Sequence, residues 1–68
     1  MNTESILESL LFISGEPISF KKLSGFTAIN EGELELSCGE LSKKYNDENR
    51  GTMILIKYGK AQMVTAGE

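Results

Sequence analysis

Apolar residues recur at helical spacing in three segments of the chain and at strand spacing near its end. In the first segment, from Asn2 or Thr3 to Ser14, the spacing predicts an amphipathic helix with Thr3 as its cap. The predicted core stripe of this helix consists of Ile6, Leu10 and Ile13, with Leu7 beside it. Phe12 points to the far side, so we expect a second apolar surface to cover it, supplied either by the wing or second helix of the same chain or by another subunit.

A sharp corner follows the first helix. Gly15 suits the left-handed residue that ends a helix, and Pro17 removes a backbone donor that a continuing helix would need. Ser19 is the expected cap of a second helix that runs to about Gly25. The turn after this helix is expected to be plugged by Phe26, Ala28 and Ile29.

A third helix is predicted from the cap Asn30 to a point between Asn46 and Glu48. Its acidic first turn suits the positive end of the helix dipole. The expected core stripe consists of Leu34, Cys38, Leu41 and Tyr45. Leu36 lies opposite this stripe, which makes it either an isolated surface leucine or a docking contact.

Two strand-like runs, Thr52–Tyr58 and residues 61–65, are separated by Gly59 and Lys60. This spacing predicts a hairpin with a type II′ or related turn. One face of the first run would carry Met53, Leu55 and Lys57, and the other Ile54, Ile56 and Tyr58. Both faces are largely apolar, and three helices can cover one of them. We therefore expect a partner to cover the second.

Together these elements predict a mostly α domain with a small β-hairpin. Three helices, a corner between the first two and a two-stranded wing form a winged helix-turn-helix. The chain has no repeat and no long linker, so residues 1–68 are expected to form one domain. Because the sequence stops directly after the hairpin, we expect it to be a fragment of a longer protein.

Composition narrows the possible chemistry. The chain has 68 residues, a net charge of −3, one cysteine and no histidine. A lone thiol forms no internal disulfide, and without histidine Cys38 is expected to be a buried apolar residue, not a nucleophile or zinc ligand. We expect no enzyme, cofactor, metal or small-molecule ligand. A signal peptide and a membrane span are also not expected, so the predicted location is the cytoplasm.

The charge pattern bears on whether the fold binds DNA. In DNA-binding winged helices the third helix enters the major groove, but here it carries mostly glutamates against Lys43 and Lys44. Strong DNA binding is therefore not expected. The alternative is the DNA-binding domain of a transcription regulator, with Lys21 and Lys22 as the nucleic-acid contacts.

The order of several short motifs resembles the N-terminal part of the segregation and condensation protein B family. The stretch from Leu10 to Ser19 reads LLFISGEPIS, and it is followed by ELSKKYN, RG and MVT. This resemblance covers about residues 6–65. It implies a nucleoid-associated, non-enzymatic scaffold with two winged-helix domains, the second of which is absent from this sequence.

The resemblance also implies homodimers that bind the kleisin subunit, segregation and condensation protein A, and through it the SMC ATPase. It transfers no kleisin-contact residue to this chain. From the surplus apolar positions, the candidate interface residues are Phe12, Leu36, Ile54 and Ile56.

Overall fold

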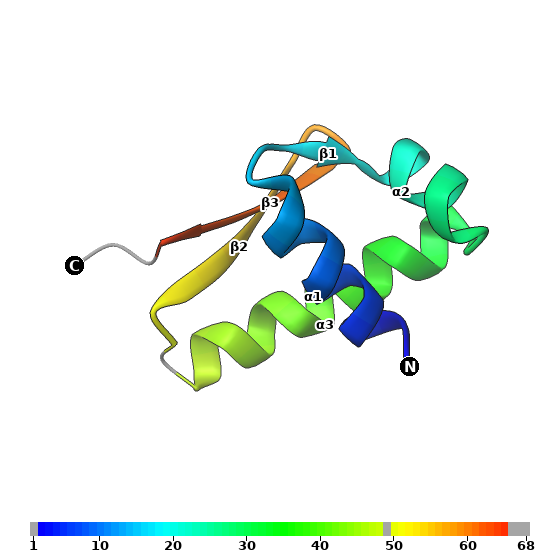
Figure 1. The fold of residues 1–68 in the computed structure, drawn as a ribbon. Coiled ribbons are helices and arrows are strands. Elements are labelled where there is room, and N and C mark those ends of the chain that lie inside the picture. Colours follow the sequence, from blue (N-terminus) through cyan, green and yellow to red (C-terminus); the bar gives the residue numbers. More distant parts are fainter. Residues whose placement is uncertain (1, 49, 66–68) are drawn as a thin grey trace.

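A computed structural model describes residues 2–48 and 50–65, which form three helices and three strands (Figure 1). In chain order these are α1 (Thr3–Ser14), β1 (Ile18–Ser19), α2 (Phe20–Thr27), α3 (Glu31–Asp47), β2 (Thr52–Lys57) and β3 (Lys60–Thr65). α1 packs against α3 and β3, while α3 also packs against α2 and β2. This arrangement is the predicted winged helix. Within the described residues, no helix combines the length and apolar character that a membrane span requires.

Side-chain caps set the start of each helix. Asn2, not Thr3, caps α1: its Oδ1 accepts from the Ser5 N–H at 2.8 Å. The predicted caps of the other helices are confirmed, since Ser19 Oγ accepts from the Lys22 N–H at 3.0 Å and Asn30 Oδ1 from the Gly32 N–H at 2.7 Å.

The helix ends are also defined by local contacts. Gly15 ends α1 with a left-handed φ of 67°, as its sequence position predicts. α2 continues to Thr27, two residues beyond the predicted end, and closes with Ala28 in the left-handed region at φ 62°. The Thr27 hydroxyl donates to the Leu23 carbonyl and accepts from the Ile29 N–H, which satisfies backbone groups at this end.

The predicted hairpin of β2 and β3 is confirmed, but the wing is a three-stranded antiparallel sheet and not a two-stranded one. Its order is β1-β3-β2, and the short strand β1 pairs Ile18 with Ala61 and Ser19 with Lys60. The Phe20 N–H then donates to the Gly59 carbonyl at 2.9 Å. The corner between α1 and α2 is therefore joined to the tip of the hairpin.

The hairpin turn lies one residue earlier than predicted. Lys57 pairs with Lys60, so the two turn residues are Tyr58 and Gly59. Both have positive φ, 52° and 73° respectively. Positive φ at both central residues is characteristic of a type I′ turn, whose twist matches that of the strands. The turn is difficult to predict from the sequence, because Tyr58 occupies its first position, where asparagine, aspartate and glycine are the usual residues.

The core lies between the three helices and the sheet. Its buried members are Leu7, Leu11, Phe20, Leu23, Leu34, Cys38, Leu41, Tyr45, Ile54 and Ala61. The predicted stripe of α3 is confirmed. The predicted stripe of α1 is only partly correct: Leu7 is buried and Leu10 packs against the core, but Ile13 is 78% exposed and Leu11 is buried with Leu7. Phe26 is also exposed, so of the three expected plugs Ile29 is the one that packs against the core.

Candidate functional site

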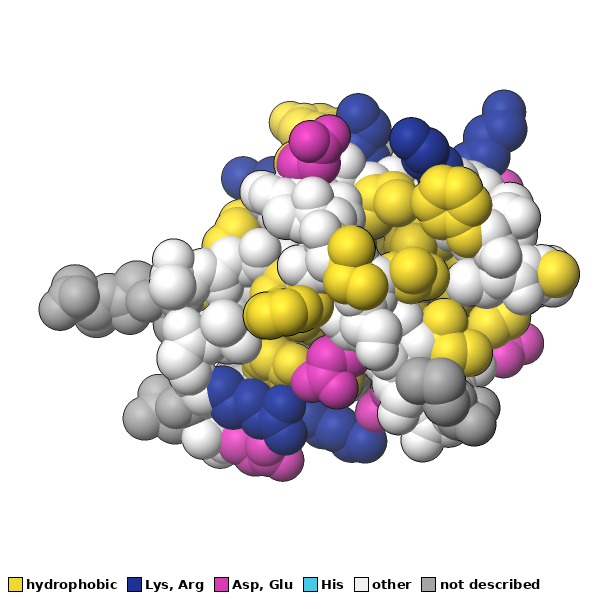
Figure 2. Space-filling model, in the orientation of Figure 1, with side chains coloured by type: hydrophobic (Ala, Val, Ile, Leu, Met, Phe, Trp, Pro, Cys, Tyr) yellow, Lys and Arg dark blue, Asp and Glu magenta, His cyan; other side chains and the backbone are white. Residues whose placement is uncertain are grey.

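The outer side of α1 is apolar. Ile6 and Ile13 lie on one flank of this side, with the half-buried Leu10 beside them. Phe12 lies on the other flank, across Ser9. Phe26 of α2 adjoins Ile6 and Leu10. We call these five apolar residues the α1 surface. Figure 2 shows apolar side chains gathered over α1 and the neighbouring part of α2. The helix thus has one apolar side in the core and another in solvent.

The α1 surface is large for so small a domain. Phe12 is 74% exposed and Phe26 63% exposed. At about 200 Å² for a phenylalanine side chain, these two residues expose about 270 Å² of apolar area. Ile13 adds to this area, so the patch falls in the size range of roughly 300–600 Å² in which surface patches are often functional.

Two shallow hollows flank the centre of the α1 surface, and Ser9 lines both. One, of about 350 Å³, lies between α1 and α2 and is lined by Ile6, Ser9, Leu10, Phe26 and Thr27. The other, of about 390 Å³, is lined by Glu8, Ser9, Phe12, Tyr45, Thr52 and Met63. A small residue between hollows lets an approaching helix come close, with its side chains seated on either side.

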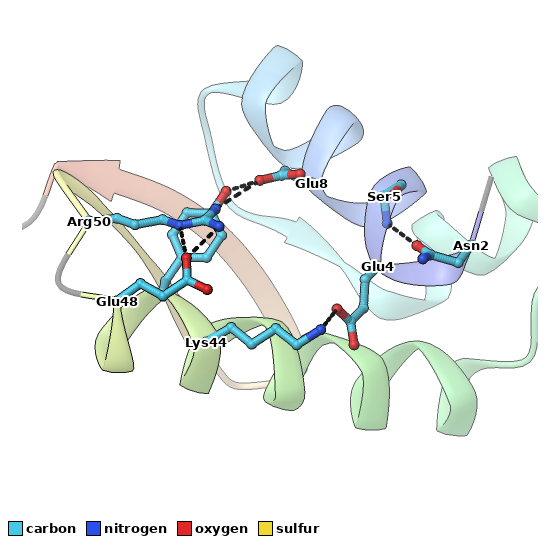
Figure 3. Close-up of polar contacts among 8 residues, drawn as sticks. Asn2, Glu4, Ser5, Glu8, Lys44, Glu48 and Arg50 are labelled. Carbon is cyan, nitrogen blue, oxygen red and sulfur yellow. Dashed lines mark hydrogen bonds and ion pairs between the residues drawn. The ribbon is translucent and has the colours of Figure 1, made fainter.

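Polar contacts fix α1 on the C-terminal half of α3 (Figure 3). Lys44 Nζ lies 2.7 Å from Glu4 Oε1. The Tyr45 hydroxyl donates to Glu8, and the Arg50 guanidinium reaches the same carboxylate at 3.5 Å. Arg50 also lies over the Tyr45 ring, with 4.4 Å between Cζ and the ring centroid. These contacts hold the α1 surface in a fixed orientation.

The electrostatics of this region favour the charge states that make these contacts. Burial, together with the hydrogen bond to Glu8, raises the pKa of Tyr45, so the phenol keeps the proton that it donates. The hydrogen bond and charge of Glu4 raise the pKa of Lys44, which stays cationic. Elsewhere in the core, burial raises the pKa of the Cys38 thiol to about 11, so it is protonated and a poor nucleophile at neutral pH.

The interface residues predicted from sequence do not form one surface. Phe12 belongs to the α1 surface. Leu36 is equally exposed, at 74%, but lies on the side of α3 opposite its buried stripe. The prediction for Ile54 is wrong: its side chain is 4% exposed and packs in the core, so it is not available for an interface in this domain. Ile56 is partly exposed near the hairpin turn.

Sequence reasoning missed Ile13 and Phe26 as surface residues. Ile13 fits the helical spacing of Ile6 and Leu10, and this favoured a core position over an exposed one. The other predicted contacts, Lys21 and Lys22, are exposed at the start of α2. Within residues 2–48 and 50–65, no three histidine, cysteine or acidic side chains form a group that could hold a metal ion.

Comparison with known proteins gives a consistent result. The family described as segregation and condensation complex subunit ScpB matches residues 5–68. Proteins named segregation and condensation protein B are 38% identical over 65 residues in Clostridium botulinum strain Hall and 37% over 65 residues in Clostridium acetobutylicum. Another in Moorella thermoacetica is 34% identical over 67 residues.

The two Clostridium alignments each cover 96% of this chain, and they cover 34% of the C. botulinum protein and 32% of the C. acetobutylicum protein. The Moorella alignment covers 98% of this chain and 34% of that relative. The chain therefore spans about a third of the length of the curated relatives it matches. The match runs through all three helices and the hairpin. By fold and by sequence, the chain belongs to the ScpB family of segregation and condensation complex subunits.

Proposed function

We propose that this domain is a non-enzymatic interaction module of a chromosome segregation and condensation complex, and that it self-associates through the α1 surface. The observation that carries the proposal is the apolar outer side of α1, whose exposed residues include Phe12 and Ile13. Leaving such a patch in water is unfavourable, and covering it contributes about 25 cal/mol for each Å² buried. A second copy of the same surface supplies matching apolar residues and the hollows beside Ser9.

In the assembled complex, we propose that the dimer binds the kleisin subunit and through it the SMC ATPase at the nucleoid. Leu36 supports a second contact of this kind, because it is exposed on the side of α3 that faces away from α1. A domain that pairs through α1 keeps this side of α3 free. The family assignment favours this role over that of a transcription regulator.

Sedimentation velocity over a range of protein concentrations tests self-association. We expect the unmodified chain to sediment as a dimer at high concentration and Phe12→Glu to remain a monomer. A symmetric dimer contains two copies of Phe12, and the substitution removes both. If each copy contributes about 2 kcal/mol to the free energy of association, the dissociation constant of the dimer rises roughly 1000-fold. Leu36→Glu is the matched control, because it changes the same charge at a residue of the same exposed fraction.

Far-ultraviolet circular dichroism shows whether each variant is folded. A folded Leu36→Glu that loses the dimer while Phe12→Glu retains it would place the interface on α3 and refute the α1 surface. A strict monomer for the unmodified chain at about 1 mM, well above the dissociation constants of specific interfaces, would refute self-association of this domain.

Binding of the purified kleisin subunit is measured separately by isothermal titration calorimetry. We expect Leu36→Glu to weaken it, while Lys43→Gln, an exposed change on the same helix, leaves it unaltered. Equal affinity for Leu36→Glu and the unmodified chain would exclude Leu36 as the contact.

A further inference from the structure

Four lysines lie at the end of the molecule where the hairpin turn is bonded to the start of α2. Lys57 and Lys60 pair with each other across the turn, and Lys60 also pairs with Ser19 of β1. Lys21 and Lys22 follow directly after Phe20, whose N–H donates to the Gly59 carbonyl. We call these four residues the lysine end. Figure 2 shows basic side chains along the top of the molecule, over α2 and the β2–β3 turn.

The lysine end is a concentration of positive charge on an acidic protein. It holds four of the seven basic residues in a chain whose net charge is −3. Among residues 2–48 and 50–65, none of the four forms an ion pair, whereas Lys44 and Arg50 at the other end of α3 both do. Charges in clusters of this kind attract a partner of opposite sign even when the whole chain is acidic.

The lysine end does not stabilise the sheet. Lys57 and Lys60 lie directly opposite each other, and like charges in that position destabilise a strand pair. Tyr58 between them is 98% exposed and adopts a φ of 52° that tyrosine disfavours. Lys-Tyr-Gly-Lys is thus a poor sequence for stability alone, and unfavourable residues that persist in a fold often mark a functional site.

We propose that the lysine end binds the phosphate backbone of duplex DNA weakly and without sequence preference. Lysines act as point charges toward phosphates, and tyrosine hydroxyls also donate to phosphate oxygens. These contacts position a protein on DNA without reading bases. The acidic first half of α3 does not take part, so the contact differs from major-groove recognition by the third helix of a winged helix.

An acidic peptide fits this end less well. Peptides that add a strand need a free sheet edge, and beside the turn β3 is paired on both sides, so such a peptide would have to use the outer edge of β2, which holds one of the four lysines. Recognition of acidic motifs commonly relies on arginine, which binds carboxylates in a bidentate manner, and the lysine end contains no arginine. The hollow nearby, of about 380 Å³, is shallow and lined partly by Lys57 and Lys60 themselves.

Fluorescence anisotropy with a labelled duplex of about 30 base pairs tests the proposal across a series of salt concentrations. Four phosphate contacts predict a slope of about −3.6 for log affinity against log salt, so affinity falls roughly 100-fold between about 50 and 200 mM salt. We expect Lys22→Gln, Lys57→Gln and Lys60→Gln each to reduce the slope to about −2.7. Lys43→Gln is the matched control, with the same net charge but a change outside the lysine end, and it should leave the slope unchanged.

Tyr58→Asn supplies a second measurement that a purely structural role would not affect. Asparagine suits the turn better, yet we expect affinity for the duplex to fall roughly threefold to tenfold, because the Tyr58 hydroxyl is lost and the shorter asparagine amide does not extend as far from the turn toward a phosphate. The proposal is overturned if about 1 mM chain does not bind the duplex at about 50 mM salt, where phosphate contacts are strong. It is also overturned if Lys43→Gln changes the slope as much as the other variants, or if poly-glutamate displaces the duplex as well as unlabelled DNA does.

This inference does not rest on self-association. The lysine end and the α1 surface share no residue, so a chain that fails to dimerise can still show the predicted salt slope. A dimer without affinity for DNA would refute the lysine end alone.

Discussion

Replacing Tyr58 by asparagine should stabilise the fold. Tyr58 is 98% exposed, so its side chain contributes almost no packing to the folded state. Its φ of 52° lies in the left-handed region, which costs most residues about 1–2 kcal/mol and asparagine much less. Because Gly59 follows it, the substitution creates Asn-Gly, a favoured pair in type I′ turns. We therefore expect the free energy of unfolding to rise by about 1 kcal/mol.

Thermal unfolding followed by circular dichroism measures this gain. For a domain of this size, about 1 kcal/mol corresponds to a rise of about 4–8 °C in Tm. Tyr58→Ala is the control: it removes the same ring but keeps a residue with a Cβ and no capacity for local hydrogen bonding in the left-handed region. Its stability should stay within about 0.5 kcal/mol of the unmodified chain. If Tyr58→Asn is no more stable than Tyr58→Ala, the turn is not strained as we describe.

Two further predictions concern α3. Asn30→Ala removes the side chain that accepts from two backbone N–H groups, so urea unfolding should show a loss of about 1 kcal/mol, whereas exposed Asn46→Ala should change little. The pKa of Cys38 rises from its ordinary 9.0 to about 11 in the folded protein, so the unfolded chain loses the thiol proton first. The protonated Cys38 thiol therefore contributes about 3 kcal/mol to the free energy of unfolding below about pH 9, and this contribution is lost as the pH rises through 11. In reducing buffer, Cys38→Ala should flatten that decline, and an unchanged decline would show that the thiol does not titrate as described.

Local signals in the sequence were sufficient for most element boundaries. Ser19 and Asn30 cap their helices through their own side chains, and Gly15 ends α1, so these positions depend little on distant parts of the chain. The stripe of α3 was also predictable, because its outer side is charged and leaves a single apolar side for the core. Where a sequence pattern is compatible with a single local structure, the sequence is sufficient to predict that structure.

The errors arise where two solutions compete. α1 is apolar on two sides, and periodicity alone does not say which side packs inward. The strand β1 has two residues, too few for any period, and its existence depends on Ala61 and Lys60 being in register far along the chain. The turn was displaced because Tyr58 is an unusual residue for it. In the candidate site, Ile54 was assigned to an interface because both faces of its strand are apolar.

The strand β1 has a consequence for the way the domain opens. Its two residue pairs and the bond from Phe20 to Gly59 connect segments about forty residues apart, and they tie the α1–α2 corner to the hairpin. Fraying of the hairpin therefore releases the corner at the same time, and the two form one cooperative unit in hydrogen exchange. Backbone amides of Phe20 and Ala61 should then exchange at a common rate, although one belongs to a helix and the other to a strand.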